Sequence, residues 1–522
     1  MSWRRMDRRE SVCTRSVRGK AGRYRERKDS EGADRVQTGL NRCLDAFSIA
    51  LNQADGRWWY TSTLKLQLAS LQFCALCRSA STGVRLTVER GTPGYLWSEG
   101  DPVVNGRVTR SMTAPRQVSL PELRPRVLIW RLPEPFRTCD AWANLQHIVF
   151  GCHFDCSVDD VTWPRKLKSL SFGRSFSKPV DRVAWPASLQ QLAFWGNFNQ
   201  TIHNVSWPAS LQRLTFWDLF NQPIDRVAWP SSLQELVFGT CFDQPIDKVA
   251  WPASLQKLTF LHRFNQPLEG VTWPPSLRYI SLGSRFDHPM DNVVLPASLW
   301  EIKFGNDFNQ PIDRVSWPAS LRRLRFSKAF DQPIAGVMWP ASLQHITFTG
   351  AFDQPLSGSV WPASLQRLHL GLHFNQPLDR VAWPPRLLEL GICGVFNQPI
   401  VGITWPVSLL RLSIEWNFDQ PLEHVSWPES LQELYLGDRF DQPIDEVVWP
   451  DSLEQLTFGN CFSQTVSNAL WPESLKFLRF GRSFQCSLDG ITWPSSLEKL
   501  MLVRRRTDPL PTWPGVVVCR SR

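Results

Sequence analysis

The chain has 522 residues, 43% hydrophobic and 20% charged, which is the composition of a globular protein. The counts of 26 Trp, 40 Pro and only 5 Tyr are unusual and together indicate one short phrase copied many times. The net charge of +10 divides into +11 over residues 1–140, −5 over 141–502 and +4 over 503–522, which excludes a long basic face on the main body and the simplest form of nucleic-acid binding.

The N-terminal residues 1–36 combine many Arg and Lys with almost no apolar periodicity, which predicts a disordered basic tail. No apolar signal-peptide core follows these charges, and no apolar stretch is long enough to span a bilayer. Twelve scattered Cys do not form a disulfide framework. We therefore expect a cytoplasmic protein that is neither secreted nor membrane-bound, and the Arg-rich start leaves a nuclear or organellar location open.

Residues 37–118 form a poorly defined N-terminal segment. Apolar residues at helical spacing predict one short amphipathic helix over residues 40–53, and residues 91–118 have the composition of a linker. Residues 119–144 are predicted to form an N-terminal cap for residues 145–502. Within this cap, Val127–Trp130 is an apolar run bounded by prolines, which favours a strand.

A phrase of 22 residues fills the chain from 145 to 502. Trp-Pro recurs every 22 residues from Trp163 to Trp493, with Leu295-Pro296 in the one missing place. We number the positions of the phrase 1 to 22 from this Trp. Position 5 is Leu in every copy from Leu145 to Leu497, and position 14 is Phe in every copy from 154 to 484. An array without insertions or deletions is typical of a continuous stack in which each copy fits its neighbours.

Each copy has the pattern of one short strand. Positions 8 and 10 are apolar while 7 and 9 are mostly polar, so the segment alternates with period two. Pro at position 2, and Asn or Asp, Gln and Pro at positions 15–17, leave no room for a helix, so the return segment should be extended, turn-like or 3₁₀. This predicts a parallel sheet of one strand per copy with little α-helix. We also expect Gln at position 6 to form a side-chain amide ladder, and Asn or Asp at position 15 to bond backbone of its own or the next copy.

The phrase resembles the leucine-rich-repeat superfamily, whose core L-x-x-L-x-L occurs here as residues 211–216, Leu-Gln-Arg-Leu-Thr-Phe. It resembles the FNIP-repeat branch more closely, through the Phe-Asn-Gln-Pro-Ile phrases at 220–224 and 308–312. The resemblance implies a curved, horseshoe-shaped solenoid with strands on the concave face and return segments on the convex face. It also raises a second possibility, because such arrays are sometimes preceded by an F-box that joins a ubiquitin ligase.

No catalytic, cofactor or metal site stands out from the repeat. The cluster of Cys139, Cys152, His153 and Cys156 fits no strong zinc spacing. His369 and His373 are four apart, but on a strand and its following turn rather than on a helix. The recurrent Ser at position 4 is a turn hydroxyl, and nearly every polar feature is copied many times, whereas an enzyme needs one unique constellation. We therefore expect no catalysis, no cofactor and no bound metal.

The residues that differ between copies lie at position 7 and beside it, on the predicted open face of the sheet. The candidate partner-binding residues are Arg213, Glu235, Lys257, Tyr279, Glu301, Lys303, Arg323, Arg325, His345, Arg367, Glu389, Arg411 and Glu433. Basic residues gather at 303–328 and acidic residues dominate 415–454, which suits a polar, electrostatically steered protein partner.

The resulting prediction is a monomeric, non-catalytic scaffold that binds a protein partner on a concave face. The first alternative is a substrate-recognition subunit of a ubiquitin ligase, in which residues 37–90 would bind the adaptor. The second is weak nucleic-acid binding through the basic ends, residues 1–36 and the basic C-terminal tail 503–522, which we consider the less favoured interpretation.

Overall fold

The computed structural model divides the chain into two units, residues 1–79 and 80–522, and every residue described here lies in the second unit. The described residues are 85–90, 92–98, 127–130, 134–136, 142–488, 490–503 and 517–520. The predicted basic tail 1–36 and the predicted helix over 40–53 therefore lie outside the described residues.

The described residues form strands and turns, with no α-helix among them. The strands are β1 (Arg85–Arg90), β2 (Thr92–Ser98), β3 (Val127–Trp130), β4 (His147–Phe150), β5 (Ser169–Phe172), β6 (Gln191–Phe194), β7 (Arg213–Phe216), β8 (Glu235–Phe238), β9 (Lys257–Phe260), β10 (Tyr279–Ser281), β11 (Glu301–Lys303), β12 (Arg323–Phe326), β13 (His345–Phe348), β14 (Arg367–Leu370), β15 (Glu389–Ile392), β16 (Arg411–Ile414), β17 (Glu433–Leu436), β18 (Gln455–Thr457), β19 (Phe477–Phe480), β20 (Lys499–Leu502) and β21 (Val517–Arg520).

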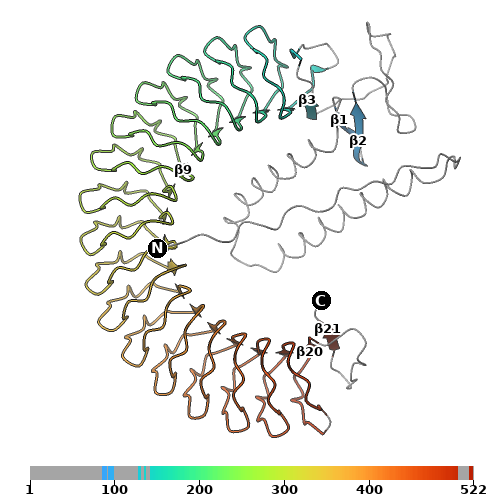
Figure 1. Ribbon diagram of the computed structural model, residues 1–522, viewed down its shortest axis with the longest axis vertical. Helices are drawn as coiled ribbons and strands as arrows, with labels where there is room; N and C mark the ends of the chain where they lie inside the picture. Colours follow the sequence, from blue (N-terminus) through green and yellow to red (C-terminus); the bar gives the residue numbers. More distant parts are fainter. Residues whose placement is uncertain are drawn as a thin grey trace, which may run out of the picture. The chain divides into compact units, whose positions relative to one another are not determined.

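Strands β4 to β20 begin at position 7 of successive copies, and each pairs in parallel with the next at an offset of one copy. His345 on β13, for example, lies opposite Arg323 on β12 and Arg367 on β14. We call each 22-residue turn of the chain a coil. The coils follow a curved path with the strands along its inner side and the return segments outside, as predicted (Figure 1). Equivalent positions of neighbouring coils are therefore stacked on one another.

The core lies between the strand and the return segment of each coil. In the coil that contains β11, the side chains at positions 5, 8, 10, 14 and 18 have no exposed surface: Leu299, Ile302, Phe304, Phe308 and Ile312. The ring centroid of Phe308 lies 4.1 Å from that of Phe304 and 6.0 and 6.1 Å from those of the equivalent Phe in the two adjacent coils. One column of Phe rings thus runs from Phe154 to Phe484, and each coil completes its core only by packing against its neighbours.

Trp at position 1 forms a second aromatic column at the edge of the core. Trp317 and Trp339 stack with ring centroids 6.4 Å apart, and Trp339 and Trp361 repeat the same distance. These rings pack on the core, but most of them are half-buried rather than buried.

Polar side chains join neighbouring coils in two ladders. Ser320 at position 4 donates to the carbonyl oxygen of Leu299 in the preceding coil, at 2.6 Å. At position 15, Asn309 Oδ1 accepts from the backbone N–H of Asp331 at 2.9 Å and from Gln332 Nε2 at 3.0 Å, both in the next coil. The expectation that position 15 bonds the backbone of a neighbouring coil is confirmed. These bonds satisfy turn backbone that would otherwise be left without partners.

The predicted amide ladder at position 6 is wrong. The backbone forms the ladder there instead: the N–H groups of Gln212 and Arg213 both donate to the carbonyl oxygen of Gln190, at 2.8 and 3.0 Å. No side-chain hydrogen bond joins Gln190 to Gln212 in the part of the chain described. The return segments contain β-turns rather than 3₁₀ helix, as in Leu321 N–H donating to Pro318 O at 3.0 Å.

The two ends of the array differ from the sequence predictions. Val127–Trp130 forms the predicted strand, β3, which pairs in parallel with β4. Thr92–Ser98, in the range we interpreted as a linker, instead forms β2, which pairs antiparallel with β1, and β1 pairs antiparallel with β3. Val517–Arg520, within the predicted tail 503–522, adds β21 in parallel to β20. Trp513-Pro514 is the sequence signal for this last strand, at a shorter spacing than 22.

Candidate functional site

The inner face of the sheet carries the side chains at positions 7 and 9. In β12, β13 and β14 the residues alternate between half-buried and buried, because positions 8 and 10 pack into the core. Positions 7 and 9 therefore face away from the core, toward the concave side. This alternation places side chains that differ between coils on one continuous surface.

All thirteen candidate residues lie on this face, in strands β7 to β17. Eleven of them occupy position 7 of consecutive coils, and we call this file of side chains, from Arg213 to Glu433, the inner row. Lys303 and Arg325 occupy position 9 beside it. The structure thus brings the candidates together, but their exposure differs. The Glu301 side chain is only 3% exposed and does not belong to an open surface.

At one end of the inner row, charges pair between adjacent coils. Glu235 accepts from Lys257 Nζ at 2.5 Å and lies 3.4 Å from Arg213 Nε. The ammonium of Lys257 also lies 5.6 Å from the ring centroid of Tyr279. Burial, followed by the charge of Glu301, raises the pKa of Tyr279 to about 12. Residues that we predicted as partner-binding are therefore engaged with one another.

A second group surrounds the buried Glu301. Its Oε1 lies 3.1 Å from Arg325 Nε, while its Oε2 is buried without a hydrogen-bond partner in the described residues. Burial raises the pKa of Glu301, and the charges of Arg325 and Arg323 oppose this shift. Arg323 lies with its guanidinium 4.9 Å from the ring centroid of Trp300, which holds it against the sheet.

His345 lies between two arginines. Arg323 and Arg367 are its direct neighbours on the adjacent strands. Burial and then the charges of these two arginines lower the pKa of His345 to about 4. The His345 ring makes no hydrogen bond with any other residue that the structure describes. The centre of the inner row is therefore cationic, with a neutral imidazole between two guanidinium groups.

We predict that His345 takes up a proton only near pH 4. Because this pKa lies below the ordinary 6.5 of histidine, the neutral form favours the folded state. The stability that depends on neutral His345 is fully present above pH 6.5 and is lost as the pH falls toward 4. An NMR titration of the histidine Cε1–H resonances, assigned with His345→Gln, measures this midpoint. A midpoint near 6.5 would contradict the geometry.

Glu389 is the most connected carboxylate of the inner row. Its Oε2 lies 3.3 Å from Arg367 Nε and 3.2 Å from Arg411 Nη2, and its Oε1 lies 3.2 Å from His369 Nε2. The hydrogen bond from His369, and then the charges and hydrogen bonds of its other neighbours, lower the pKa of Glu389 to about 2 against the opposing effect of burial. Glu389 thus stays ionised at any physiological pH and fixes three side chains.

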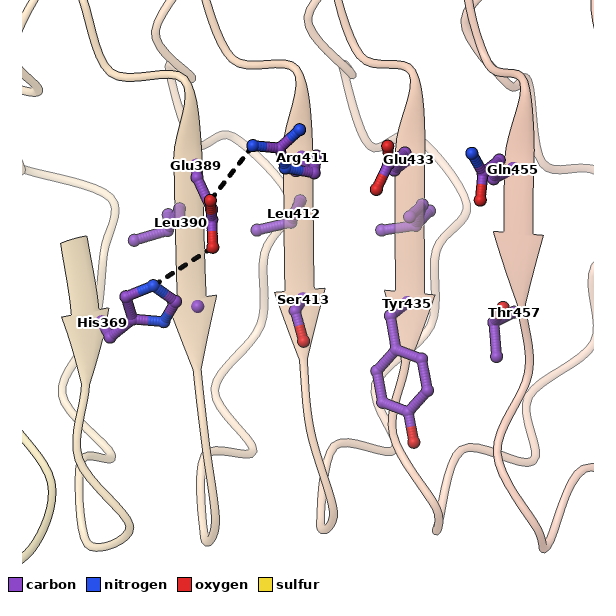
Figure 2. Close-up of a pocket in the computed structure, with 12 residues that line it drawn as sticks. His369, Glu389, Leu390, Arg411, Leu412, Ser413, Glu433, Tyr435, Gln455 and Thr457 are labelled. Carbon is purple, nitrogen blue, oxygen red and sulfur yellow. Dashed lines mark hydrogen bonds and ion pairs between the residues drawn. The ribbon is translucent and has the colours of Figure 1, made fainter. Parts of the chain in front are cut away.

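A shallow hollow of about 260 Å³ opens beside Glu389, across strands β14 to β18 (Figure 2). Gly391 at position 9 forms part of its floor, and a Cβ there would lie 2.5 Å from His369 Nδ1. The absence of this side chain lets His369 lean toward Glu389, as Figure 2 shows. Glu433, which forms no hydrogen bond or ion pair with another described residue, stands on the far side.

The sequence analysis missed the position-9 residues of this hollow. His369, Gly391, Ser413, Tyr435 and Thr457 line it together with Gln455 at position 7. The signal was present, because position 9 alternates with the core in the same way as position 7. What the sequence does not show is which of these side chains lean aside and leave a space.

His369, one of the two histidines considered from the sequence, pairs with Glu389 on the next strand. Among the described residues no group of three or more His, Cys, Asp or Glu side chains is placed to hold a metal ion. Cys139, a member of the other cluster considered from the sequence, lies outside the described residues. None of the described residues forms a helix capable of crossing a bilayer.

Comparison with known proteins agrees with this architecture. The model of the family "FNIP Repeat" matches residues 198–241, 220–262, 264–307, 308–350, 396–438 and 418–461. The crystal structure of CroV588, a circular leucine-rich-repeat protein, is similar with a TM-score of 0.56 and 30% identity, over 72% of this chain and 66% of that one. The chain belongs to the leucine-rich-repeat superfamily and carries FNIP repeats.

More distant likenesses are to other repeat proteins. A chain of the Toll–Spatzle complex from Drosophila has 13% identity and a TM-score of 0.47, over 70% of this chain and 53% of that one. An internalin from Listeria monocytogenes has 12% identity and a TM-score of 0.32, over 69% and 91%. This FNIP-repeat chain thus spans between half and two thirds of the length of CroV588 and the Toll–Spatzle chain. No curated protein sequence matches it significantly.

Proposed function

We propose that this FNIP-repeat chain is a non-catalytic scaffold that binds a protein partner on its inner face. The fold is typical of protein-interaction scaffolds. One observation carries the proposal. The apolar and turn positions are used for packing between coils, whereas the inner face holds a continuous file of different polar side chains and a hollow beside it. Such a surface suits recognition of an extended polar segment better than a small apolar ligand.

The ligase and nucleic-acid alternatives depend on the chain ends. Of residues 37–90, which would bind a ligase adaptor, the structure describes only β1. The basic ends 1–36 and 503–522 lie mostly outside the described residues. No observation on the described residues favours either alternative over binding on the inner face, so both stay predictions.

A pair of matched double variants tests the proposed function. The first, His345→Ala with Arg367→Ala, changes the inner row. The second, Met338→Ser with Val360→Ser, changes position 22 on return segments of neighbouring coils, where the side chains are 81% and 75% exposed. Proximity labelling with the full chain should identify a partner whose recovery falls at least ten-fold with the first variant and stays unchanged with the second.

The opposite result would contradict the proposal. If the partners recovered with the inner-face variant match those of the unmodified chain while the return-segment variant loses them, binding occurs on the outer side. Circular dichroism of both variants provides the folding control, because neither substitution removes a fully buried side chain.

A further inference from the structure

From β11 to β17 the inner row alternates in charge except at one place. From β11 to β17 its side chains are Glu301, Arg323, His345, Arg367, Glu389, Arg411 and Glu433. Each arginine has a glutamate on at least one side, but between Arg323 and Arg367 the alternating pattern would require a carboxylate, and His345 stands there instead. The row therefore contains a gap in which one negative charge from another molecule would complete the pattern.

The groups around this gap are available to a ligand. Arg367 reaches Glu389 through Nε, which leaves its Nη groups without a partner among the described residues. Arg323 is held by the ring of Trp300, and its Nε is buried without a hydrogen-bond acceptor in the described part of the chain, so a ligand would contact this arginine through its Nη groups. The His345 ring makes no hydrogen bond there either, so its N–H can donate. Two guanidinium groups and an imidazole N–H form a site for a single carboxylate.

The hollow, in contrast, would accept a positive charge from the ligand. The Glu433 carboxylate has no described ion-pair partner and borders the hollow with the side chains of Tyr435 and Gln455. Burial raises the pKa of Tyr435, and the negative charges of Asp438 and Glu415 add to this shift. A basic side chain in this hollow would pair with Glu433, with Tyr435 beside it.

The distance between the two places sets a spacing along the ligand. His345 on β13 and Glu433 on β17 are four strands apart, which is about 19 Å at about 4.8 Å per strand. An extended peptide covers about 3.3 Å per residue, so the two charges of the ligand should be about six residues apart. The peptide would cross the strands and follow the inner row.

We propose that the inner face binds an extended protein segment with an acidic side chain between Arg323 and Arg367 and, about six residues along, a basic side chain at Glu433. This proposal rests on the proposed function and names the chemistry of its partner. A nucleic acid fits this face less well, because Glu301, Glu389 and Glu433 flank the arginines and would repel successive phosphates.

Selection of a displayed random peptide library on the full chain tests the proposal. The enriched peptides should carry Asp or Glu and Lys or Arg about six residues apart. A representative peptide should bind at least ten-fold more weakly to Arg367→Ala and to Glu433→Gln. Arg367→Glu should prefer the same peptide with Lys in place of its acidic residue, which a merely structural effect of the substitution would not produce.

Each variant has a matched control. Arg380 lies on the return segment of the same coil as Arg367 and also contacts a carboxylate through Nε, at 3.6 Å from Asp379 against 3.3 Å from Glu389 for Arg367. Arg380→Ala should leave the affinity unchanged. Glu429→Gln, at the exposed position 3 of the coil that contains Glu433, should do the same.

The outcomes separate this proposal from the proposed function. Peptides that lack the charge spacing but still lose affinity with inner-face variants would overturn the proposal and leave the scaffold function standing. Equal losses with Arg367→Ala and Arg380→Ala would also overturn it, as would displacement of the peptide by a short single-stranded oligonucleotide. If no peptide is enriched, or no inner-face substitution changes binding, both proposals are wrong.

Discussion

Replacing Phe308 by Ala is expected to lower the free energy of unfolding by about 3–5 kcal/mol. The Phe308 side chain has no exposed surface, and its ring contacts Phe304 in its own coil and Phe286 and Phe330 in the two neighbours. The coils stack tightly, so they cannot collapse into the cavity without breaking the strand pairing on both sides. The loss should therefore be near the upper end for a buried aromatic residue.

Hydrogen exchange read by mass spectrometry measures both the size and the place of this loss. Protection should fall most in the coils that contain β10, β11 and β12 and remain near normal in distant coils, because each coil contacts only its neighbours. Phe484 is the matched control. It ends the Phe column and has an aromatic neighbour on one side only, so Phe484→Ala should cost less. A uniform loss along the array would contradict the stacked-coil arrangement.

Removal of one full coil is expected to leave a folded chain, whereas removal of half a coil should unfold the coils next to the deletion. Deletion of 339–360 joins position 22 of one coil to position 1 of another, so the Phe column, the Trp column and the strand register continue unbroken. Deletion of 339–349 joins position 22 to position 12 and omits β13, which places turn residues where the core requires Leu and Phe.

Thermal unfolding and limited proteolysis distinguish the two deletions. The chain without 339–360 should unfold within a few degrees of the full chain and resist proteolysis over the whole array. The chain without 339–349 should be cleaved near the junction. Equal protease resistance of the two chains would show that the coils do not depend on the 22-residue register.

The repeat explains how much of the fold could be predicted. Leu at position 5 and Phe at position 14 recur without exception, so the strand, the turns and the stack follow from one phrase, and the residues of the inner row could be named before their contacts were known. The strands at the two ends of the array were harder to predict. β1 and β2 contain no copy of the phrase, and Trp513-Pro514 before β21 lies at a spacing shorter than 22 residues.

The contacts on the inner face could not be predicted, because each charged side chain has more than one possible partner on the adjacent strands. Glu389 could pair with a residue of the preceding or of the following coil. In the structure it contacts Arg367 and His369 of the preceding coil and Arg411 of the following one. Glu301 is buried and paired with Arg325, which its place at position 7 does not reveal. The hollow exists because Gly391 has no side chain beside His369. Each feature arises from one residue that departs from the pattern.

Site-specific photo-crosslinking tests the inner face most directly as the partner-binding surface. A photoreactive residue would replace Gln455, at the edge of the hollow, or Val360, on a return segment where the side chain is 75% exposed. The inner-face position should cross-link the partner and the return-segment position should not. A cross-link from Val360 with none from Gln455 would place the partner on the outer side and contradict the proposed function.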